Sequence, residues 1–503
     1  MLLGELIEGL SVRGVFGPLM RRVDGICYHS GQARANYLFV AIPGLGTDGH
    51  KYVAEAAKAG ACAAVISSGR EGELVGLPLT LVSVDDTRLA LAQLSGRFFN
   101  HPSLSIGLIG VTGTNGKTTV TYLIESILKA WGEEVGVIGT INYRYKGRTF
   151  PPLTTTPESL DLQRLLREMV DEGVRWVVLE VSSHALDLKR VHGCHLDGAV
   201  FTNLSQDHLD YHLTMDNYFK AKLKLFTELL RDSGKRDRFA LVNLDDPRGH
   251  QVASQSAIPP LTYGLKNGTD IRPWEVEMGE WGIRGKIATP KGVVPFDSSL
   301  IGEFNLYNIM AAVGVAVALD VPFKAIREGI ESLGGVPGRL ERVDEGQDFT
   351  VLIDYAHTPD ALERALKVTR NFCRGRLIVV FGCGGNRDRG KRPIMGRVSA
   401  QLADISIITS DNPRLEEPEA IISDILIGFE GTGAPELTEI KGARKGYIPI
   451  ADRGEAIRQA VKMAEAGDLI LIAGKGHEDY QVIGNKRVHF DDREEARAAI
   501  RAR

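Results

Sequence analysis

The sequence contains little of what marks secreted, membrane or nucleic-acid-binding proteins. Glu5 and Glu8 stand where a signal peptide would carry lysine or arginine, and the longest apolar run, 309–319, is too short to cross a bilayer. Lysine and arginine number 60 against 64 aspartates and glutamates, so the basic excess that general nucleic-acid binding requires is missing. Neither a disulfide framework nor a zinc site is expected, because the cysteines are odd in number and never spaced as Cys-x-x-Cys: Cys27, Cys62, Cys194, Cys373 and Cys383. We expect a cytoplasmic protein without membrane insertion and without a nucleic-acid partner.

Glycine, by contrast, is abundant, with 56 residues in the chain. This is typical of proteins with many tight turns and close backbone approaches to ligands. Hydrophobic residues make up 43% and charged residues 25%, as in globular proteins with buried cores. At roughly 150 residues per domain, the 503 residues predict about three domains.

The order of strand and helix patterns predicts α/β structure throughout. Short apolar strands at 37–42, 63–67 and 79–84 alternate with helical segments, and Pro102 interrupts this pattern. A Gly/Pro-rich segment at 334–338 marks a second break. The predicted domains are a small N-terminal α/β domain, a central P-loop ATPase-type α/β domain and a C-terminal Rossmann-like α/β domain, at 1–102, 103–335 and 336–503.

A glycine-rich turn follows the strand at 105–111, with the sequence Thr-Gly-Thr-Asn-Gly-Lys-Thr-Thr. A helix with one apolar face comes next, so backbone N–H groups and a helix N-terminus point at one place. This predicts a phosphate-binding loop in which Lys117 meets the β- and γ-phosphates of a nucleotide and Thr118 meets Mg²⁺. Val111 holds the position of the first glycine of the strict motif, so the loop is a shorter variant. The alternative is an ordinary glycine-rich turn with a surface lysine.

Two later segments carry candidate metal ligands. Glu180 ends a buried-looking strand, where open α/β sheets bind ligands. The segment 202–212 is dense in oxygen and imidazole groups, from Asp207, His208, Asp210 and His212. The alternative is that these side chains are structural. In the following helix, the pattern alone assigns Lys220, Lys222 and Lys224 to a solvated face.

Motifs along nearly the whole chain resemble those of the Mur ligase family. They are TGTNGKTT, EVSSHALDLKRV, TNLSQDHLDYH, IGEFNLYN, VPGRLE, DYAHTPDAL, GCGGNRDRGKRP, DNPR and GKGHE. The resemblance implies three domains that bind a UDP-sugar peptide, ATP and an incoming amino acid, in that order. It also implies an ATP-dependent amide ligase that acts as a monomer on small-molecule substrates.

The resemblance assigns the nucleotide and metal sites residue by residue. It makes Lys117, Lys222 and His208 catalytic, and gives Lys222 a carbamate that turns a cation into a metal ligand. The implied magnesium ligands are Thr118, Glu180, His208 and Lys222. The implied ATP contacts are Gly113, Thr114, Asn115, Gly116, Lys117, Thr118, Thr119, Asn305, Asn308, Arg339, Asp354 and His357. For the last five, the alternatives are helix caps and interdomain ion pairs.

The resemblance also assigns the UDP-sugar peptide to a set of polar residues. They are Ser30, Thr154, Thr155, Thr156, Ser182 and Arg190. The chain departs from the family pattern at His29 and Gly31, which replace Asp and Arg, at Thr154, which replaces Asn, and at Leu188, which often is Gln. These departures affect individual polar contacts more than the class of ligand.

The implied amino-acid site lies in the C-terminal domain. Its residues are Arg387, Asp411, Asn412, Pro413, Arg414, Gly474 and Glu478. The tetrad 411–414 resembles that of the branch that adds meso-2,6-diaminopimelate rather than lysine. A guanidinium pairs with the extra carboxylate of diaminopimelate, whereas lysine would leave Arg414 unpaired. The alternative is a turn with a surface arginine.

The implied reaction joins meso-2,6-diaminopimelate to UDP-N-acetylmuramoyl-L-alanyl-D-glutamate in peptidoglycan synthesis. The D-glutamyl carboxylate takes the γ-phosphate of ATP, and the amine then displaces phosphate from the acyl phosphate. Lys117, two Mg²⁺ ions and His208 would neutralise the charge. The rivals are a lysine-adding relative, a folylpolyglutamate synthase, a P-loop switch or motor ATPase, and an inactive scaffold.

Overall fold

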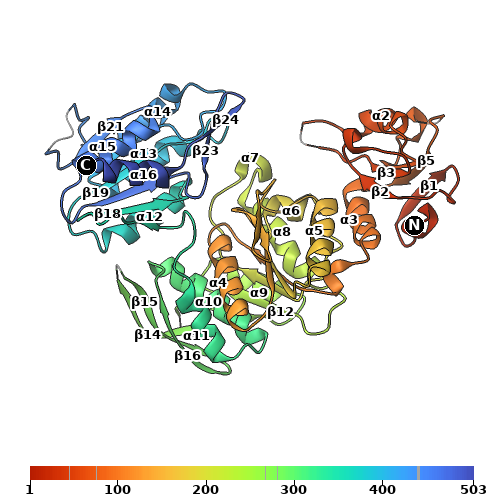
Figure 1. Ribbon diagram of the computed structural model, residues 1–503, viewed down its shortest axis with the longest axis horizontal. Helices are drawn as coiled ribbons and strands as arrows, with labels where there is room; N and C mark the ends of the chain where they lie inside the picture. The colour runs from red at the N-terminus through yellow and green to blue at the C-terminus, as the bar shows by residue number, and fades with distance from the viewer. Residues whose placement is uncertain (45, 75, 267, 280, 439–441) are drawn as a thin grey trace.

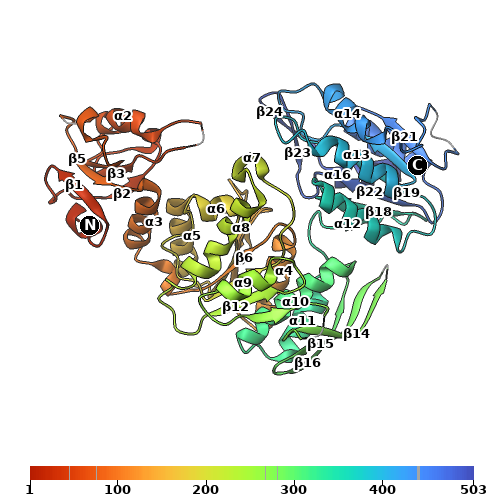
Figure 2. The same cartoon turned by 180° about the vertical axis from the view of Figure 1, so that it is seen from behind.

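The computed structural model describes residues 1–44, 46–74, 76–266, 268–279, 281–438 and 442–503. Three large sheets follow one another along the chain, and each is covered by helices, so the α/β fold class with three domains is confirmed. The N-terminal and C-terminal parts lie at opposite ends of an elongated molecule, with the central part between them (Figure 1; Figure 2 shows the view from behind). Within the described residues, none of the helices combines the length and apolar character that a membrane crossing requires.

The N-terminal sheet has five strands in the order β1-β5-β4-β3-β2, and only β1 is antiparallel to its neighbour. Its strands are β1 (Val12–Phe16), β2 (Gly25–Cys27), β3 (Tyr37–Val40), β4 (Ala63–Ser67) and β5 (Thr80–Val84). The three strands predicted here are confirmed. The helices are α1 (Leu3–Leu6), η1 (Ser30–Gln32), η2 (Gly49–Tyr52), α2 (Val53–Lys58), η3 (Glu71–Glu73), α3 (Thr87–Phe98) and η4 (Pro102–Leu104).

The central sheet has eight strands in the order β13-β12-β11-β6-β10-β7-β8-β9, with β6 in its middle. They are β6 (Gly107–Thr112), β7 (Val135–Ile138), β8 (Tyr143–Tyr145), β9 (Arg148–Phe150), β10 (Trp176–Glu180), β11 (Gly198–Phe201), β12 (Phe239–Asn243) and β13 (Leu261–Tyr263). The glycine-rich β-like insertion predicted at 260–300 supplies β13 and a separate three-stranded sheet of β14 (Arg272–Gly279), β15 (Gly282–Thr289) and β16 (Gly292–Ser298).

Helices cover both faces of the central sheet. Apolar side chains of α4, α10 and α11 form one core with one face of the sheet, and those of α5, α6 and α8 form a core with the other. The helices are α4 (Lys117–Ala130), α5 (Ser159–Asp171), α6 (Ser183–Asp187), α7 (Leu209–His212), α8 (Met215–Lys224), the π-turn η5 (Leu225–Leu229), α9 (Gly249–Gln255), α10 (Glu303–Ala318) and α11 (Phe323–Ser332). The long apolar run is α10, a core helix of this domain.

The C-terminal sheet has six strands in the order β17-β18-β22-β19-β20-β21, all parallel except β17. They are β17 (Glu341–Val343), β18 (Thr350–Asp354), β19 (Leu377–Phe381), β20 (Ile405–Ile408), β21 (Gly446–Pro449) and β22 (Leu469–Ala473), and β23 (Tyr480–Ile483) with β24 (Lys486–His489) forms a hairpin. The helices are α12 (Pro359–Arg370), α13 (Lys391–Leu402), α14 (Pro418–Leu426), η6 (Ile427–Phe429), α15 (Arg453–Met463) and α16 (Asp492–Arg501).

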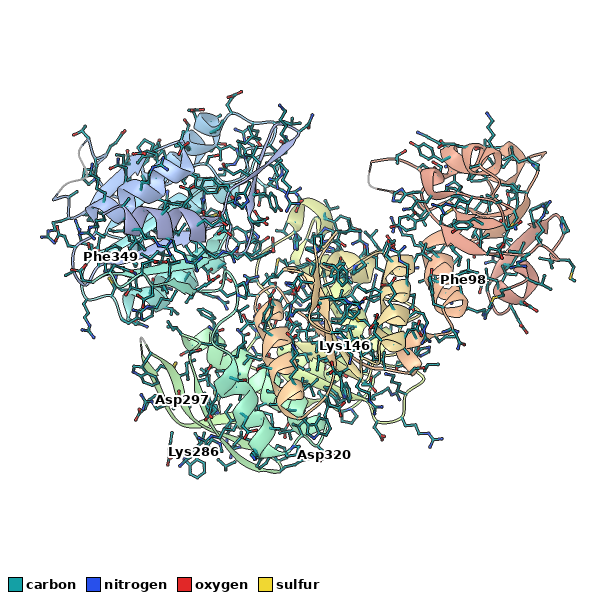
Figure 3. All side chains as sticks on the ribbon, viewed as in Figure 1. Phe98, Lys146, Lys286, Asp297, Asp320 and Phe349 are labelled. Atoms are coloured by element: carbon teal, nitrogen blue, oxygen red, sulfur yellow. The ribbon has the colours of Figure 1, made fainter. Side chains whose placement is uncertain are left out.

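The predicted domain boundaries fall in connecting segments. Residue 102 begins η4, and residue 335 lies between α11 and β17. Side chains fill each of the three parts (Figure 3), with Phe98 on α3 of the first, Lys146 in the second and Phe349 in the third. The boundaries themselves stay predictions.

Candidate functional site

The loop after β6 has the conformation that a phosphate-binding loop needs. Gly113 and Gly116 have φ angles of 148° and 88°, and α4 begins at Lys117. A Cβ atom at Gly113 would overlap the Thr202 hydroxyl, and one at Gly116 would overlap the Asn308 amide oxygen. The backbone can therefore approach a ligand closely here, with the first N–H groups of α4 at the same place.

Two lysines converge on one carbonyl oxygen of this loop. Lys117 Nζ donates to the carbonyl oxygens of Gly113 at 3.0 Å and Thr114 at 2.9 Å, and Lys222 Nζ donates to that of Gly113 at 2.8 Å. Burial lowers the pKa of both amines, and the charge of Lys117 lowers that of Lys222 further. The assignment of Lys222 to a solvated face is wrong, because its side chain is buried on the face of α8 that carries Tyr218.

Glu180 ends β10 beside the loop, as predicted. Its Oε1 accepts hydrogen bonds from Thr118 Oγ1 and from the backbone N–H of Thr140, both at 3.0 Å, and its Oε2 accepts one from Thr140 Oγ1 at 2.9 Å. Arg339 Nη2 reaches across from the C-terminal domain to Thr118 Oγ1 at 3.4 Å. Oxygen atoms of this kind fit Mg²⁺, which commonly binds one or two carboxylates together with substrate phosphates.

The four candidate ligands in 207–212 do not form one metal-binding group. In the part of the chain that is described, no three His, Cys, Asp or Glu side chains come together in a way that could hold a metal ion. His212 Nε2 lies 3.0 Å from Ser183 Oγ, and Asp210 is exposed. His208 has a φ of 55°, and its ring meets that of Tyr218 edge-to-face, with the ring centres 6.0 Å apart; Tyr218 is hydrogen-bonded to Thr114 at 3.1 Å. Desolvation by the surrounding residues lowers the pKa of His208, and the neighbouring Asp207 carboxylate partly opposes this shift.

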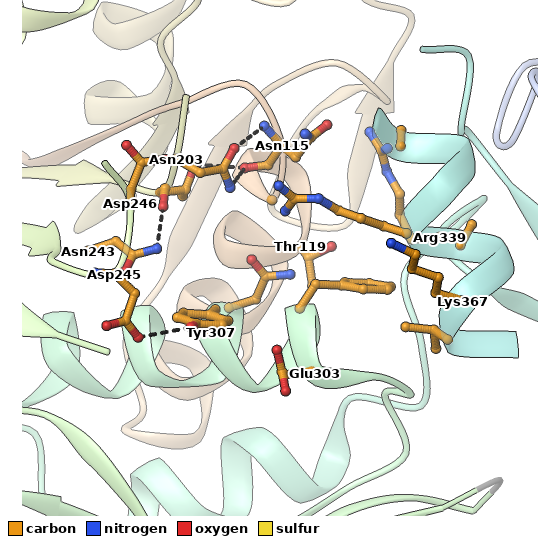
Figure 4. Close-up of a pocket in the computed structure, with 18 of the residues that line it drawn as sticks. Asn115, Thr119, Asn203, Asn243, Asp245, Asp246, Glu303, Tyr307, Arg339 and Lys367 are labelled. Atoms are coloured by element: carbon orange, nitrogen blue, oxygen red, sulfur yellow. Dashed lines mark hydrogen bonds between the residues drawn. The ribbon is translucent and has the colours of Figure 1, made fainter. Parts of the chain in front are cut away.

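A pocket of about 540 Å³ opens between the phosphate loop, α10 and α12 (Figure 4). Seven of the predicted ATP contacts line it: Asn115, Gly116, Thr118, Thr119, Asn308, Arg339 and Asp354. Other lining side chains had not been predicted, among them Asn203, Asn243, Asp245, Tyr307, Arg364 and Lys367. Asn203 and Tyr307 lie within quoted motifs, whereas Asp245 does not; it meets Tyr307 only in the fold, with Tyr307 Oη donating to Asp245 Oδ2 at 2.8 Å.

The other predicted ATP contacts lie at the edge of this pocket or behind it. Asn305 Oδ1 accepts from Asn308 Nδ2 at 2.9 Å, so Asn305 holds Asn308 from behind. His357 is half-buried, with Nδ1 2.8 Å from the Tyr355 carbonyl oxygen, and burial lowers its pKa. Asp354, which lines the pocket, accepts from the N–H groups of Leu340 and Ala356, and burial raises its pKa. Gly113, Thr114 and Lys117 form the loop itself.

Five of the six residues predicted for the UDP-sugar peptide lie together near the end of β10. Thr156 Oγ1 accepts from Ser182 N at 3.1 Å, and Arg190 Nη1 donates to the Thr156 carbonyl oxygen at 3.2 Å. Thr154 Oγ1 donates to the same carbonyl at 2.8 Å, and Thr155 Oγ1 lies 3.2 Å from Thr140 Oγ1. Ser30 begins η1 in the N-terminal domain, and among the described residues no hydrogen bond joins it to the other five.

The predicted amino-acid site lies where the strands of the C-terminal sheet end. Asn412 Nδ2 donates to Glu478 Oε2 at 2.9 Å, and Gly474 has a φ of 116° beside the Asp411 carboxylate. Burial raises the pKa of Glu478, whereas nearby Lys475 and Arg453 keep that of Asp411 low. Pro413 and the half-buried Arg414 complete the tetrad, and Arg387 is exposed on the neighbouring loop.

Lys475 is a central residue of this site that the sequence motifs did not lead us to predict. It is completely buried, and its Nζ lies 3.4 Å from Asp411 Oδ1, 3.2 Å from Asn412 Oδ1 and 3.3 Å from Glu478 Oε2. Its position inside GKGHE, between two selected residues, is the signal that could have found it.

The connection between the two sites runs through residues 336–340. Gly338 has a φ of 64°, and a Cβ there would overlap the backbone N–H of His477. The next residue, Arg339, packs its guanidinium over the Tyr355 ring, 4.8 Å from the ring centre. The segment therefore touches the amino-acid loop on one side and Thr118 on the other.

Family models match all three parts of the chain. The Mur ligase family catalytic domain matches residues 22–99, the Mur ligase middle domain 111–316, and the Mur ligase glutamate ligase domain 338–476. A UDP-N-acetylmuramoyl-L-alanyl-D-glutamate–2,6-diaminopimelate ligase of Geobacter metallireducens is 48% identical, over 100% of this chain and 98% of the relative. The chain belongs to the Mur ligase family.

Other Mur ligases agree in sequence and in fold. A relative of the same name from Geobacillus kaustophilus is 46% identical over 93% of this chain and 92% of its own length. A solved structure of a UDP-N-acetylmuramoyl-L-alanyl-D-glutamate–2,6-diaminopimelate ligase superposes with a TM-score of 0.69 and 32% identity, covering 100% of this chain and 99% of that one. The MurF ligase from Thermotoga maritima, solved with ADP, shares the fold at a TM-score of 0.60 and 19% identity, covering 97% and 99%.

Proposed function

We propose that the chain is an ATP-dependent ligase that joins meso-2,6-diaminopimelate to UDP-N-acetylmuramoyl-L-alanyl-D-glutamate through an acyl phosphate, as a step of peptidoglycan synthesis. The observation that carries this proposal is the full-length similarity to ligases of that name, at 42–48% identity. The phosphate loop, the pocket of nucleotide size and the Arg414 loop support it independently of the names.

The first step transfers the γ-phosphate of ATP to the D-glutamyl carboxylate. A carboxylate is a poor electrophile, and phosphorylation gives it a leaving group without an enzyme nucleophile. Within the described residues, the hydrogen-bond acceptors of the Lys117 ammonium are the carbonyl oxygens of Gly113 and Thr114, so it can turn from them to the phosphates. Most of the rate then comes from positioning and from neutralising charge on the transferred group.

The magnesium site would be built from Thr118, Glu180, His208 and a carbamate on Lys222. Magnesium ions supply positive charge at the β- and γ-phosphate oxygens when bound. The carbamate needs a neutral amine, because only the unprotonated lysine adds CO₂. The buried position of Lys222, with its lowered pKa, supports that modification.

The second step is attack of the diaminopimelate amine on the acyl phosphate, with phosphate leaving. Arg387 and Arg414 would hold carboxylates of the amino acid, and Glu478 an ammonium group. The selectivity over lysine then follows from Arg414, because lysine would leave this half-buried guanidinium without a carboxylate partner. Exclusion of water protects the acyl phosphate.

We further propose that the enzyme is a cytoplasmic monomer. The five cysteines are free, as a reducing compartment allows, and the formal net charge is -4. Light scattering of the purified chain would report a mass near 54.8 kDa. A mass of twice that value would replace the monomer by a dimer.

The test is ADP release from Mg-ATP and UDP-N-acetylmuramoyl-L-alanyl-D-glutamate, with meso-diaminopimelate in one reaction and L-lysine in another. Turnover with diaminopimelate alone is the expected result. Turnover with lysine instead would keep the ligase and remove the role of Arg414. ADP release that ignores both amino acids would indicate a P-loop ATPase of another kind.

A further inference from the structure

Two loops of the C-terminal domain bring the two candidate arginines to one place. The loop after β19 carries Arg387, and the loop after β20 carries Arg414. Both side chains pass Gly384, since a Cβ built there would lie 2.9 Å from Arg414 Nη1 and 3.7 Å from Arg387 Cγ. The distance between the two guanidinium groups therefore depends on how these loops are held against each other.

Three hydrogen bonds join the loops directly, and each has a main-chain group as donor or acceptor. Gly385 N donates to the Asn412 carbonyl oxygen at 2.9 Å, and Arg414 Nη1 donates to the Gly385 carbonyl oxygen, also at 2.9 Å. Leu415 N donates to Asn386 Oδ1 at 3.0 Å. Each loop thus supplies hydrogen-bond partners for the other on the side where the arginines stand.

Glu416 is the residue that ties both loops to the domain behind them. Its Oε1 accepts a short hydrogen bond from the backbone N–H of Asn386 in the other loop. Its two oxygens accept from Arg392 Nη1 and Nη2 at 2.9 Å each, in a paired geometry. Arg392 Nη2 also donates to the Gly384 carbonyl oxygen at 3.3 Å.

The Arg392 side chain is held in place by burial and by its own ion pairs. It lies in the first turn of α13, its side chain is fully buried, and its Nη1 also donates to Asp424 Oδ2 at 2.8 Å. Among the described residues its Nε has no partner. A buried arginine with an unsatisfied N–H contributes little net stability compared with apolar side chains in the same place. Its role is therefore better explained by the orientation that it imposes on Glu416.

We propose that Glu416, held by Arg392, is a positioning residue that sets Arg387 and Arg414 at the spacing required by an amino acid with a second carboxylate. The proposal rests on the proposed function and deepens it. Without the Glu416 carboxylate, Asn386 N and Arg392 lose their common acceptor, and the two loops can move apart. Binding of diaminopimelate weakens, while the sites for ATP and the UDP-sugar peptide are untouched.

The test is the variant Glu416→Gln, which keeps the shape of the side chain and removes its charge. We expect the KM for diaminopimelate to rise about 10-fold or more, the KM for ATP and for the UDP-substrate to stay within twofold, and the preference for diaminopimelate over lysine to fall. Asp468→Asn is the matched control, because it breaks a similar buried pair with Arg376, 2.6 Å long, at the amino ends of the central strands β19 and β22 of the same sheet. Glu419→Gln controls for a surface charge on the same segment.

A second variant covers the case in which Glu416→Gln does not fold. Asn386→Gly removes the acceptor for Leu415 N at an exposed position whose φ of 52° glycine tolerates, and it should raise the KM for diaminopimelate by a smaller factor. An unchanged KM, an equal rise for all three substrates, or the same rise in Asp468→Asn would overturn the proposal. If the wild-type enzyme itself ignores diaminopimelate, the proposed function fails instead, so the two failures are distinguishable.

Discussion

The lysine side chains of the two sites have different partners. At the phosphate loop, Lys117 and Lys222 donate to carbonyl oxygens, and neither forms an ion pair with a carboxylate within the described residues. At the amino-acid site, Lys475 lies between Asp411 and Glu478. The first arrangement leaves both amines without a carboxylate ion pair until phosphates or a modification arrive. The second is already neutralised, so it selects ligands by geometry rather than by total charge.

The largest expected effect comes from removing the Lys117 ammonium group at the phosphate loop. Lys117→Met should lower kcat by about 10³, because one charge-stabilising donor of the transferred phosphoryl group is lost. Its thermal stability should not fall, since a half-buried ammonium without a carboxylate ion pair is removed. Steady-state ADP release and a thermal melt measure both quantities. A variant that keeps a tenth of the wild-type kcat would show that Lys117 is not near the reacting phosphate.

The second prediction separates charge from modification at Lys222. Lys222→Arg keeps a positive charge but cannot carry a carbamate, so kcat should fall by about 10². The matched control is Lys220→Arg on the exposed side of α8, which should behave as wild type. Carbon-13 NMR of the enzyme in labelled bicarbonate should give a carbamate signal in the wild type and in the control, but none in Lys222→Arg. Equal activity of Lys222→Arg and wild type would exclude a required carbamate.

The third prediction concerns the amino-acid site. Arg414→Gln should lower kcat/KM for diaminopimelate by about 10², which corresponds to about 2–3 kcal/mol for a lost charge-assisted pair. The KM for ATP should stay the same. Arg397→Gln, on the exposed face of α13, is the control. If diaminopimelate and lysine are discriminated as well as before, selectivity lies elsewhere.

The smallest effect is on stability against pH. Arg392 and the Asn386 N–H lower the pKa of Glu416 from its ordinary 4.5 to about 2. A lowered carboxyl pKa contributes stability that is present above about pH 4.5 and is lost as pH falls towards 2. The free-energy difference between wild type and Glu416→Gln in urea unfolding should therefore be constant near neutrality, at about 1–3 kcal/mol, and shrink below pH 4.5. A difference that does not change with pH would show that the pair is not ionic.

Local sequence signals predicted the parts of the sites that local structure creates. The strand–glycine–lysine–helix order gave the phosphate loop, and Glu180 was placed at the end of its strand. The burial of Lys222 was also readable, because helical spacing puts it on one face with Tyr218 and Phe226. The lysines at 220, 222 and 224 instead alternate with a period of two, and this alternation favoured the interpretation as a solvated face.

Contacts between distant segments were beyond the reach of the pattern. Tyr307 and Asp245 are 62 positions apart, and Asn115 meets Asp360 at 3.1 Å across 245 positions. His208 and His212 both pack against His184 and Tyr218, and the left-handed backbone of His208 is a feature that no spacing rule reveals. These contacts form only when the sheets and α12 have packed together, and a local sequence pattern carries no information on that packing.

The short segment 336–340 limits how such enzymes can be recombined. Gly338 rests on the backbone of the GKGHE loop, and the adjacent Arg339 reaches Thr118. One inserted residue would displace the two sites by roughly 3 Å, against a tolerance of about 0.5 Å for productive geometry. A chimera that exchanges C-terminal domains between family members should therefore place its crossover before residue 336 and keep this segment with the domain it came from.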